Sequence, residues 1–274
     1  MKRGKRLVKL LAGLLCICLL FTSCAPAELS DEKSIALKYS QEVQNLEKLC
    51  KVWGYTKYYH PAFLLGQKDW DKELKKLIPV VSEAEEEEVN NILHEWFVSL
   101  GEIDYGNSES ITLPPEEERI EQADTSWIRE DYLGAELTED LSQLGPIPNI
   151  DRSKSPVKFN QGKYPDFSNE ATHMIFNYGN MSNRLLGLFR VWNAVEYYFP
   201  YLDLMDENWH DLLLEYISQM LNANDRHSYD LILASMTAKL RDPHVSFTDT
   251  ESITEELGEY LIPVNLMMIE GYPV

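Results

Sequence analysis

Apolar residues recur at intervals of three and four positions in two separate stretches of the chain. They are Leu46, Leu49, Cys50 and Trp53 in the first stretch, and Leu185, Leu188, Phe189, Trp192, Val195 and Phe199 in the second. This spacing places them on one face of an α-helix. Pro61 and Pro200 follow at positions where proline ends a helix. Each stretch therefore predicts a helix with one buried face.

Two more helices are predicted after each of these. The second helix covers about Asp69 to Ile78 in the first stretch and Asn208 to Leu221 in the second. The third helix is marked by apolar residues at helical spacing, which are Val89, Ile92, Leu93, Trp96 and Leu100, then Tyr229, Ile232, Leu233, Met236 and Leu240. Each stretch thus predicts three packed helices.

The two stretches are copies of one unit. Trp53 and Trp192 are 139 positions apart, and the same offset relates Trp70 to Trp209. Identical residues occur at this offset from Leu46, Leu49, Val52, Trp53, Tyr58, Tyr59, Pro61, Leu65, Trp70, Leu74 and Ile78. Such self-similarity indicates a duplicated structural unit. The repeated tryptophans and tyrosines favour core packing, with stacking on a sugar or a peptide as the alternative.

The expected fold is therefore mostly α, with duplicated three-helix units joined by a long irregular linker. The linker is rich in proline, and Leu133, Leu137, Leu141 and Leu144 predict one helix within it. A β-strand is expected from Leu261 to Ile269. The predicted segments are 1–23 (leader), 24–44 (tether), 45–101 (first repeat), 102–182 (linker), 183–247 (second repeat) and 248–274 (a further segment).

The N-terminus has the pattern of an exported lipoprotein. Basic residues precede an apolar run from Leu10 to Phe21, and Cys24 follows closely. The run falls short of the roughly 20 apolar residues that span a bilayer, so a cleaved leader is favoured over a membrane helix. Lipid on Cys24 would anchor the protein to a membrane. We therefore expect it in the bacterial cell envelope, on the extracytoplasmic side.

Charge and cysteine usage exclude several classes of function. The chain has 25 basic and 45 acidic side chains, with a net charge of −20, so nucleic acid is not an expected partner. Cys16 and Cys18 leave with the leader and Cys24 carries lipid, so Cys50 alone remains. No disulfide within the chain is expected, and Cys50 is expected to be a buried, inert thiol. The run from Glu85 to Glu88 is expected to cap a helix at its positive end.

No complete catalytic motif is present. The six histidines show no ligand-like pair, so no metal or cofactor is expected. Two matches to Ser-x-x-Lys lie in the tether and the linker, and both are interpreted as accidental. The one compact polar cluster, from Leu240 to Phe247, contains Asp242 and His244. From its spacing, His244 is either a base or a residue that caps or packs a helix end.

The segment from Leu49 to Pro79, with Tyr58-Tyr59-His60-Pro61 and Trp70-Asp71, resembles a region of a known family. It is similar to the N-terminal helical region of tail-specific serine peptidases, the C-terminal processing and tricorn-core family, particularly its bacterial lipoprotein members. Leu185 to Pro200, followed by Leu240 to Phe247, resembles the helical segment that leads into the PDZ domain of those proteins.

The resemblance implies a general-base role for His244. It also implies that 248–274 is the start of a truncated PDZ-like segment, and that the catalytic serine belongs to a later domain that this sequence lacks. The chain is then expected to be the non-catalytic N-terminal region of a peptidase that cleaves extracytoplasmic peptides or proteins, either as a truncated product or as a partial sequence. Two alternatives are a lipid-anchored module that binds peptide or glycan, and a structural partner of a separate catalytic subunit.

Overall fold

The structure is a computed structural model that describes residues 38–106, 124–160, 164–170, 176–248 and 251–258, and two short strands at 268–269 and 272–273. The leader, Cys24 and most of the predicted C-terminal strand lie outside the described residues. The chain divides into two units, Met1–Ser40 and Gln41–Val274. Both helical repeats and the linker lie in the second unit.

The first repeat forms three main helices and one short one. These are α3 (Gln41–Tyr59), α4 (Pro61–Leu64), α5 (Trp70–Ser82) and α6 (Glu86–Ser99). Pro61 ends α3 as predicted, and it also starts α4, where its missing N–H removes no helical bond. The Glu85 and Glu88 side chains form a capping box at the start of α6, which confirms the predicted cap.

The second repeat reproduces this order of elements. It consists of α9 (Met181–Tyr198), the 3-10 helix η2 (Leu202–Leu204), α10 (Trp209–Asn222) and α11 (Arg226–Ala238). Asn180, Asn208 and Asp225 cap the three α-helices by accepting hydrogen bonds from backbone N–H groups. The mostly α fold is confirmed.

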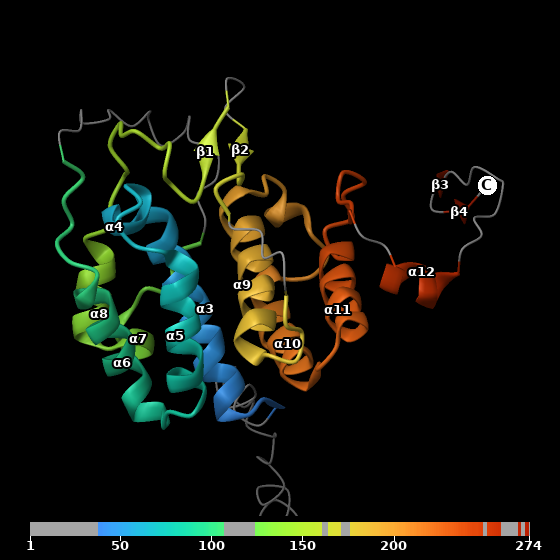
Figure 1. The fold of residues 1–274 in the computed structure, drawn as a ribbon, viewed down its shortest axis with the longest axis horizontal. Helices are drawn as coiled ribbons and strands as arrows, with labels where there is room; N and C mark the ends of the chain where they lie inside the picture. The colour runs from blue at the N-terminus through green and yellow to red at the C-terminus, as the bar shows by residue number, and fades with distance from the viewer. Residues whose placement is uncertain are drawn as a thin grey trace, which may run out of the picture. The chain divides into compact units, whose positions relative to one another are not determined.

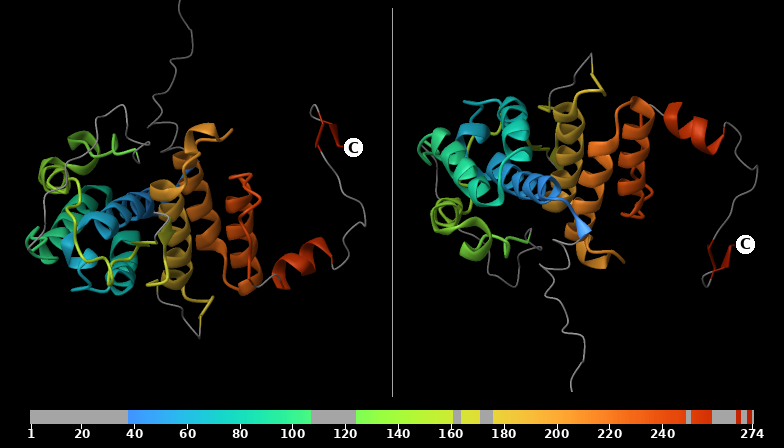
Figure 2. Two further views of the ribbon diagram at one scale, coloured as in Figure 1. Left: turned by 90° about the horizontal axis from the view of Figure 1, so that it is seen from above. Right: turned by 90° about the horizontal axis from the view of Figure 1, so that it is seen from below.

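The two repeats pack against each other through equivalent helices. Helix α3 contacts α10, α9 contacts α5, and α3 contacts α9 (Figure 1). Both views of Figure 2 show the blue helix α3 against the yellow and orange helices α9 and α10. Since α3 corresponds to α9 and α5 to α10, the repeats exchange contacts in the manner of a two-fold axis.

A cluster of equivalent tyrosines lies at this contact. The ring centroids of Tyr58 and Tyr197, which are repeat partners, are 5.2 Å apart. The Tyr58–Tyr198 distance is 5.1 Å and the corresponding Tyr59–Tyr197 distance is 6.1 Å. Each of these pairs is edge to face, a favourable arrangement of aromatic quadrupoles. The repeat contact thus uses one tyrosine pair twice.

The repeated tryptophans make the same hydrogen bond in each copy. Trp53 Nε1 donates to the Trp70 carbonyl at 2.9 Å, and Trp192 Nε1 donates to the Trp209 carbonyl at 3.2 Å. Trp53 is 0% exposed and Trp192 is 1% exposed. The prediction that these side chains belong to the core is confirmed.

The linker carries two short helices where the sequence predicted one. Helix α7 (Glu130–Leu133) and helix α8 (Ala135–Ser142) are separated by Gly134, whose φ of 75° interrupts the helix. The predicted leucines are all buried, namely Leu133, Leu137, Leu141 and Leu144. Further along, β1 (Lys158–Phe159) pairs antiparallel with β2 (Pro165–Asp166), with Phe159 opposite Pro165. The rest of the described linker is irregular, as predicted.

The C-terminal part contains one helix that the sequence did not predict. Helix α12 (Glu251–Leu257) is held to α11 by a hydrogen bond of 2.7 Å from Ser252 Oγ to Asp230 Oδ2. Strand β3 (Met268–Ile269) pairs antiparallel with β4 (Tyr272–Pro273). The end of the predicted strand is therefore extended, and it is followed by a second strand.

Candidate functional site

His244 lies in the turn that follows α11. Asp242 Oδ1 accepts a hydrogen bond from the His244 backbone N–H at 2.8 Å and lies 2.7 Å from His244 Nδ1. These bonds lower the pKa of Asp242, which keeps its carboxylate ionised. The His244 side chain is 91% exposed. This exposure argues against a packing role, whereas a base and a helix-end cap both stay predictions.

The turn borders a hollow of about 390 Å³. Its walls come from η2, the end of α9 and the turn itself, and they include Phe199, Tyr201, Leu204, Met205, Leu240 and His244. Tyr201 is 57% exposed and Leu204 is 71% exposed, so the apolar part of the wall faces solvent. An ion pair of 2.7 Å between Lys239 and Glu207 lies nearby.

The chemistry available in this hollow is incomplete. A carboxylate on Nδ1 fixes the imidazole and leaves Nε2 for a reacting group, which is the arrangement of a general base. No serine, threonine or cysteine is among the described residues that line the hollow. The Asp242–His244 pair has the arrangement of a base, but for nucleophilic catalysis the nucleophile would have to come from outside the described lining.

A buried charge network joins the linker to both repeats. Glu170 forms ion pairs with Lys57 of α3 and with Arg190 of α9, whose Nε lies 3.0 Å from Glu170 Oε2. Glu170 also accepts a hydrogen bond of 3.2 Å from Trp70 Nε1. Arg190 also binds Asp71 of α5, with Nε 3.1 Å from Asp71 Oδ1. Burial lowers the pKa of Lys57 and raises that of Asp71. Every charge has a partner, so this network is structural.

The second repeat carries different side chains at the corresponding positions. Glu196 stands where Lys57 stands in the first copy, and His210 stands where Asp71 stands. His210 Nε2 lies 3.3 Å from Glu196 Oε1. Across the part of the chain that the structure describes, no group of three His, Cys, Asp or Glu side chains is arranged to hold a metal ion.

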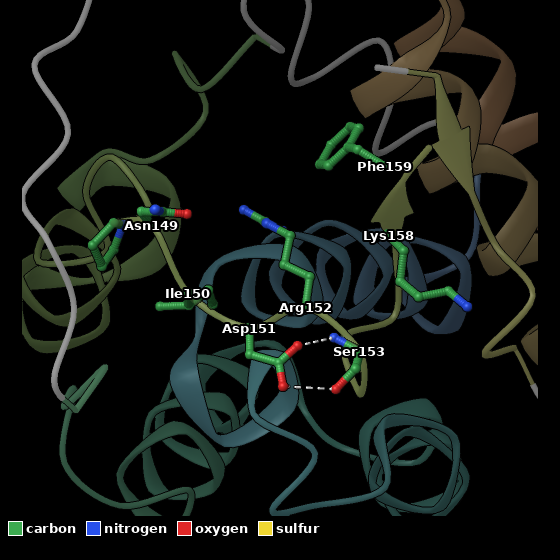
Figure 3. A pocket seen from close by; sticks show the side chains of 8 residues that line it. Asn149, Ile150, Asp151, Arg152, Ser153, Lys158 and Phe159 are labelled. Atoms are coloured by element: carbon green, nitrogen blue, oxygen red, sulfur yellow. Dashed lines mark hydrogen bonds between the residues drawn. The ribbon is translucent and has the colours of Figure 1, made fainter. Parts of the chain in front are cut away.

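A second hollow, of about 450 Å³, lies over the linker (Figure 3). It is lined by Pro148, Asn149, Ile150, Asp151, Arg152, Ser153, Lys158 and Phe159. In Figure 3 the Arg152 side chain extends between Asn149 and Phe159, away from the Asp151 carboxylate, which is bound to Ser153. The Arg152 guanidinium lies 5.4 Å from the centre of the Phe159 ring.

Two equivalent tyrosines border Arg152. Tyr59 ends α3 and Tyr198 ends α9, so the 139-residue offset relates them. Burial raises the pKa of both phenols, and the positive charge of Arg152 opposes that rise. The Phe159 ring centre is 6.3 Å from that of Tyr198. The sequence pattern did not single out Arg152, because its partners lie far away along the chain.

Cys50 has the environment that the sequence predicted. It is buried in α3, and Asn193 Nδ2 lies 3.3 Å from its sulfur. Burial raises the pKa of the thiol well above its ordinary value. The predicted burial of Cys50 is confirmed, and its low reactivity stays a prediction.

Comparison with known proteins found no matching family model, curated protein or solved structure. No helix within the described ranges has the length and apolar character needed to cross a membrane.

Proposed function

We propose that this chain is the helical N-terminal region of an exported, lipid-anchored serine peptidase of the tail-specific type. In this role Cys24 carries the lipid, the duplicated helices form a scaffold, and His244 acts as general base for a serine in a separate domain. The substrate is an extracytoplasmic peptide or protein. The resemblance of the repeats and of the Asp242–His244 segment to that family motivates the proposal.

One observation carries the proposal. An exposed histidine, oriented by a carboxylate, borders an apolar hollow in which no described residue is a nucleophile. A histidine with only a capping role gains nothing from such exposure beside apolar side chains. A base that serves a neighbouring domain needs an exposed side chain, because its Nε2 must reach a serine. It also needs the apolar hollow, because an apolar side chain of the peptide would bind there.

Reading the coding DNA beyond the codon for Val274 tests the origin of the nucleophile. An open frame that encodes a PDZ domain and a serine-peptidase domain, directly or after one frameshift, is the expected result. A stop codon followed by unrelated sequence, together with repeated failure to co-purify a serine peptidase, would remove the proposal.

The role of His244 is tested in the extended protein. Replacing His244 by alanine should lower kcat for peptide cleavage by about 10²- to 10⁴-fold, the usual contribution of a general base. The matched control is His227→Ala, because His227 is a half-exposed histidine of α11 that pairs with acidic residues of α12. Equal effects of the two substitutions would argue against a base at position 244.

A second candidate function is binding without catalysis. It is favoured by the exposure of Tyr201 and Leu204, since isolated apolar side chains of this size beside a hollow offer anchors for a peptide. Titration with a library of unstructured peptides should then show saturable binding that Tyr201→Ala weakens. The control is Val98→Ala on α6, because Val98 is as exposed as Tyr201 but does not line this hollow.

A further inference from the structure

Arg152 differs from the other arginines that the structure describes. Arg129, Arg190, Arg226 and Arg241 each pair with a carboxylate, and Arg184 donates to the carbonyl oxygens of Tyr178 and Met220. The Arg152 side chain makes neither kind of contact with a described residue, and its guanidinium lies over the Phe159 ring. The chain carries 45 acidic side chains, so an arginine without a carboxylate partner is conspicuous.

We infer that the hollow around Arg152 binds a carboxylate group that is attached to an aromatic or aliphatic substituent. The inference rests on the contacts of Arg152, Tyr59, Tyr198 and Phe159, and it does not depend on any catalytic role of His244.

The position of Arg152 favours a bound anion. Partial burial lowers the pKa of Arg152, the nearby phenols of Tyr59, Tyr105 and Tyr198 oppose that change, and the guanidinium remains charged at neutral pH. The Arg152 side chain is partly buried, and a charge with no counter-charge among the described residues loses hydration that no described group replaces. A bound carboxylate would restore it through two parallel N–H···O bonds, the geometry that a planar guanidinium favours.

Two neutral donors complete the site. The hydroxyls of Tyr59 and Tyr198 have no hydrogen-bond partner among the described residues, whereas Tyr105 already donates to the Tyr59 carbonyl at 2.9 Å. Tyr59 and Tyr198 end equivalent helices, and both phenols interact electrostatically with Arg152 from outside the lining of the hollow. A ligand on Arg152 that also reached these two phenols would contact both repeats and the linker.

The other charges of the hollow favour a singly charged ligand. Lys158 lies 3.7 Å from Asp166, and Asp151 accepts two hydrogen bonds of 2.9 Å from Ser153. These bonds lower the pKa of Asp151, so its negative charge persists. Among the described lining residues, Arg152 is the one cation without a carboxylate partner, and the Asp151 carboxylate lies beside it in the chain. A dianion such as phosphate would therefore have one charge unmatched. A carboxylate matches that single charge.

The apolar part of the hollow selects the substituent. Phe159 is 46% exposed, and Pro148 and Ile150 also line the space. Its volume of about 450 Å³ is within the range of small-molecule sites. An aromatic or aliphatic group attached to the carboxylate would cover the Phe159 ring. Such a group could belong to a free small acid or to the C-terminal residue of a peptide.

Four probes test the site in the full chain by isothermal titration at fixed ionic strength. They are N-acetyl-phenylalanine, its amide, an acetylated pentapeptide ending in phenylalanine, and the amide of that pentapeptide. Both free acids should bind, and each amide should bind at least about tenfold more weakly, because a charge-assisted pair is lost. A pentapeptide that binds tenfold tighter than N-acetyl-phenylalanine identifies a peptide end as the source. Equal affinities identify a small acid.

Variants separate the site from general charge effects. Arg152→Gln should weaken the acids at least about tenfold, and Tyr198→Phe, which keeps the ring, by about two- to tenfold. Arg129→Gln removes the same charge at an exposed position and should leave binding unchanged. The inference is overturned if acids and amides bind alike, if Arg152→Gln binds the acids normally, or if folded wild-type protein binds none of the probes at millimolar concentration.

Discussion

Asn193 of α9 stands at the repeat position that Gly54 has in α3, and the Asn193 side chain lies directly against Gly54. A Cβ atom added to Gly54 would lie only 1.6 Å from Asn193 Oδ1. Asn193 Nδ2 donates to the Cys50 carbonyl at 3.2 Å and to the Phe189 carbonyl at 2.9 Å. Cys50 and Phe189 are themselves repeat partners. One amide therefore bonds equivalent points of both helices, and the absence of a side chain at Gly54 makes room for it.

Gly54→Ala should destabilise the fold by about 3 kcal/mol, because the new methyl group overlaps a buried side chain between two helices. Urea unfolding followed by circular dichroism measures the change. Gly145→Ala is the control, because a Cβ there meets no atom within 4 Å. Adding Asn193→Gly to Gly54→Ala should recover part of the loss, and no recovery would show that the overlap is not its cause.

Lys57→Met should destabilise the protein by about 3 kcal/mol, because it leaves the Glu170 carboxylate short of a partner in a buried network. Lys72→Met provides the comparison. Its ion pair with Asp69 is largely exposed, so a change below about 1 kcal/mol is expected. Similar free energies of unfolding for the two variants would contradict a structural role for the network.

His60 should make stability depend on pH. The side chain is buried, and its Nδ1 accepts a hydrogen bond of 3.1 Å from the Ala62 N–H. Burial lowers its pKa from 6.5 to about 4. The fold therefore has its full stability above about pH 6.5, where His60 is neutral in both the folded and the unfolded chain. As the pH falls towards 4, protonation of the unfolded chain lowers the free energy of unfolding by about 3 kcal/mol.

The comparison for His60 is His60→Asn, which retains a cap acceptor but does not titrate. Between pH 7 and pH 4, the wild-type free energy of unfolding should fall by about 3 kcal/mol more than that of the variant. Parallel pH profiles would show that other groups cause the acid sensitivity.

Cys50 should not react with a thiol reagent in the native protein, because burial removes both access and thiolate. The measurement uses Ellman's reagent on a chain in which Cys24 is replaced by serine and the leader is absent. Labelling should require a denaturing concentration of urea. Complete labelling within minutes under native conditions would mean that α3 opens readily.

The duplication and the helix faces could be predicted from the sequence because local spacing determines both. Trp53, Trp192 and the leucines of the linker are buried where periodicity placed them. Helix α12 was missed because its apolar positions are too few for a periodic signal. The split at Gly134 was missed because an isolated glycine within a helical pattern does not fix its φ.

The contacts between distant parts of the chain could not be predicted in the same way. Glu170 meets Lys57 across more than 100 positions, and Arg152 meets Tyr59 across more than 90. No local pattern connects such residues. His244 was found because Asp242 is only two positions away, so that this part of the site lies within one turn.

The linker has a consequence for how the chain would respond to cleavage. Helices α3 to α6 share one core with α9 and α10, and the residues after Asp124 contribute Trp127, Val157 and Glu170 to the same interior. A cut between Gly106 and Asp124 would end covalent continuity but would leave these contacts between described residues in place. The two fragments would remain associated as a complementing pair, so gel electrophoresis would reveal a break that size-exclusion chromatography does not.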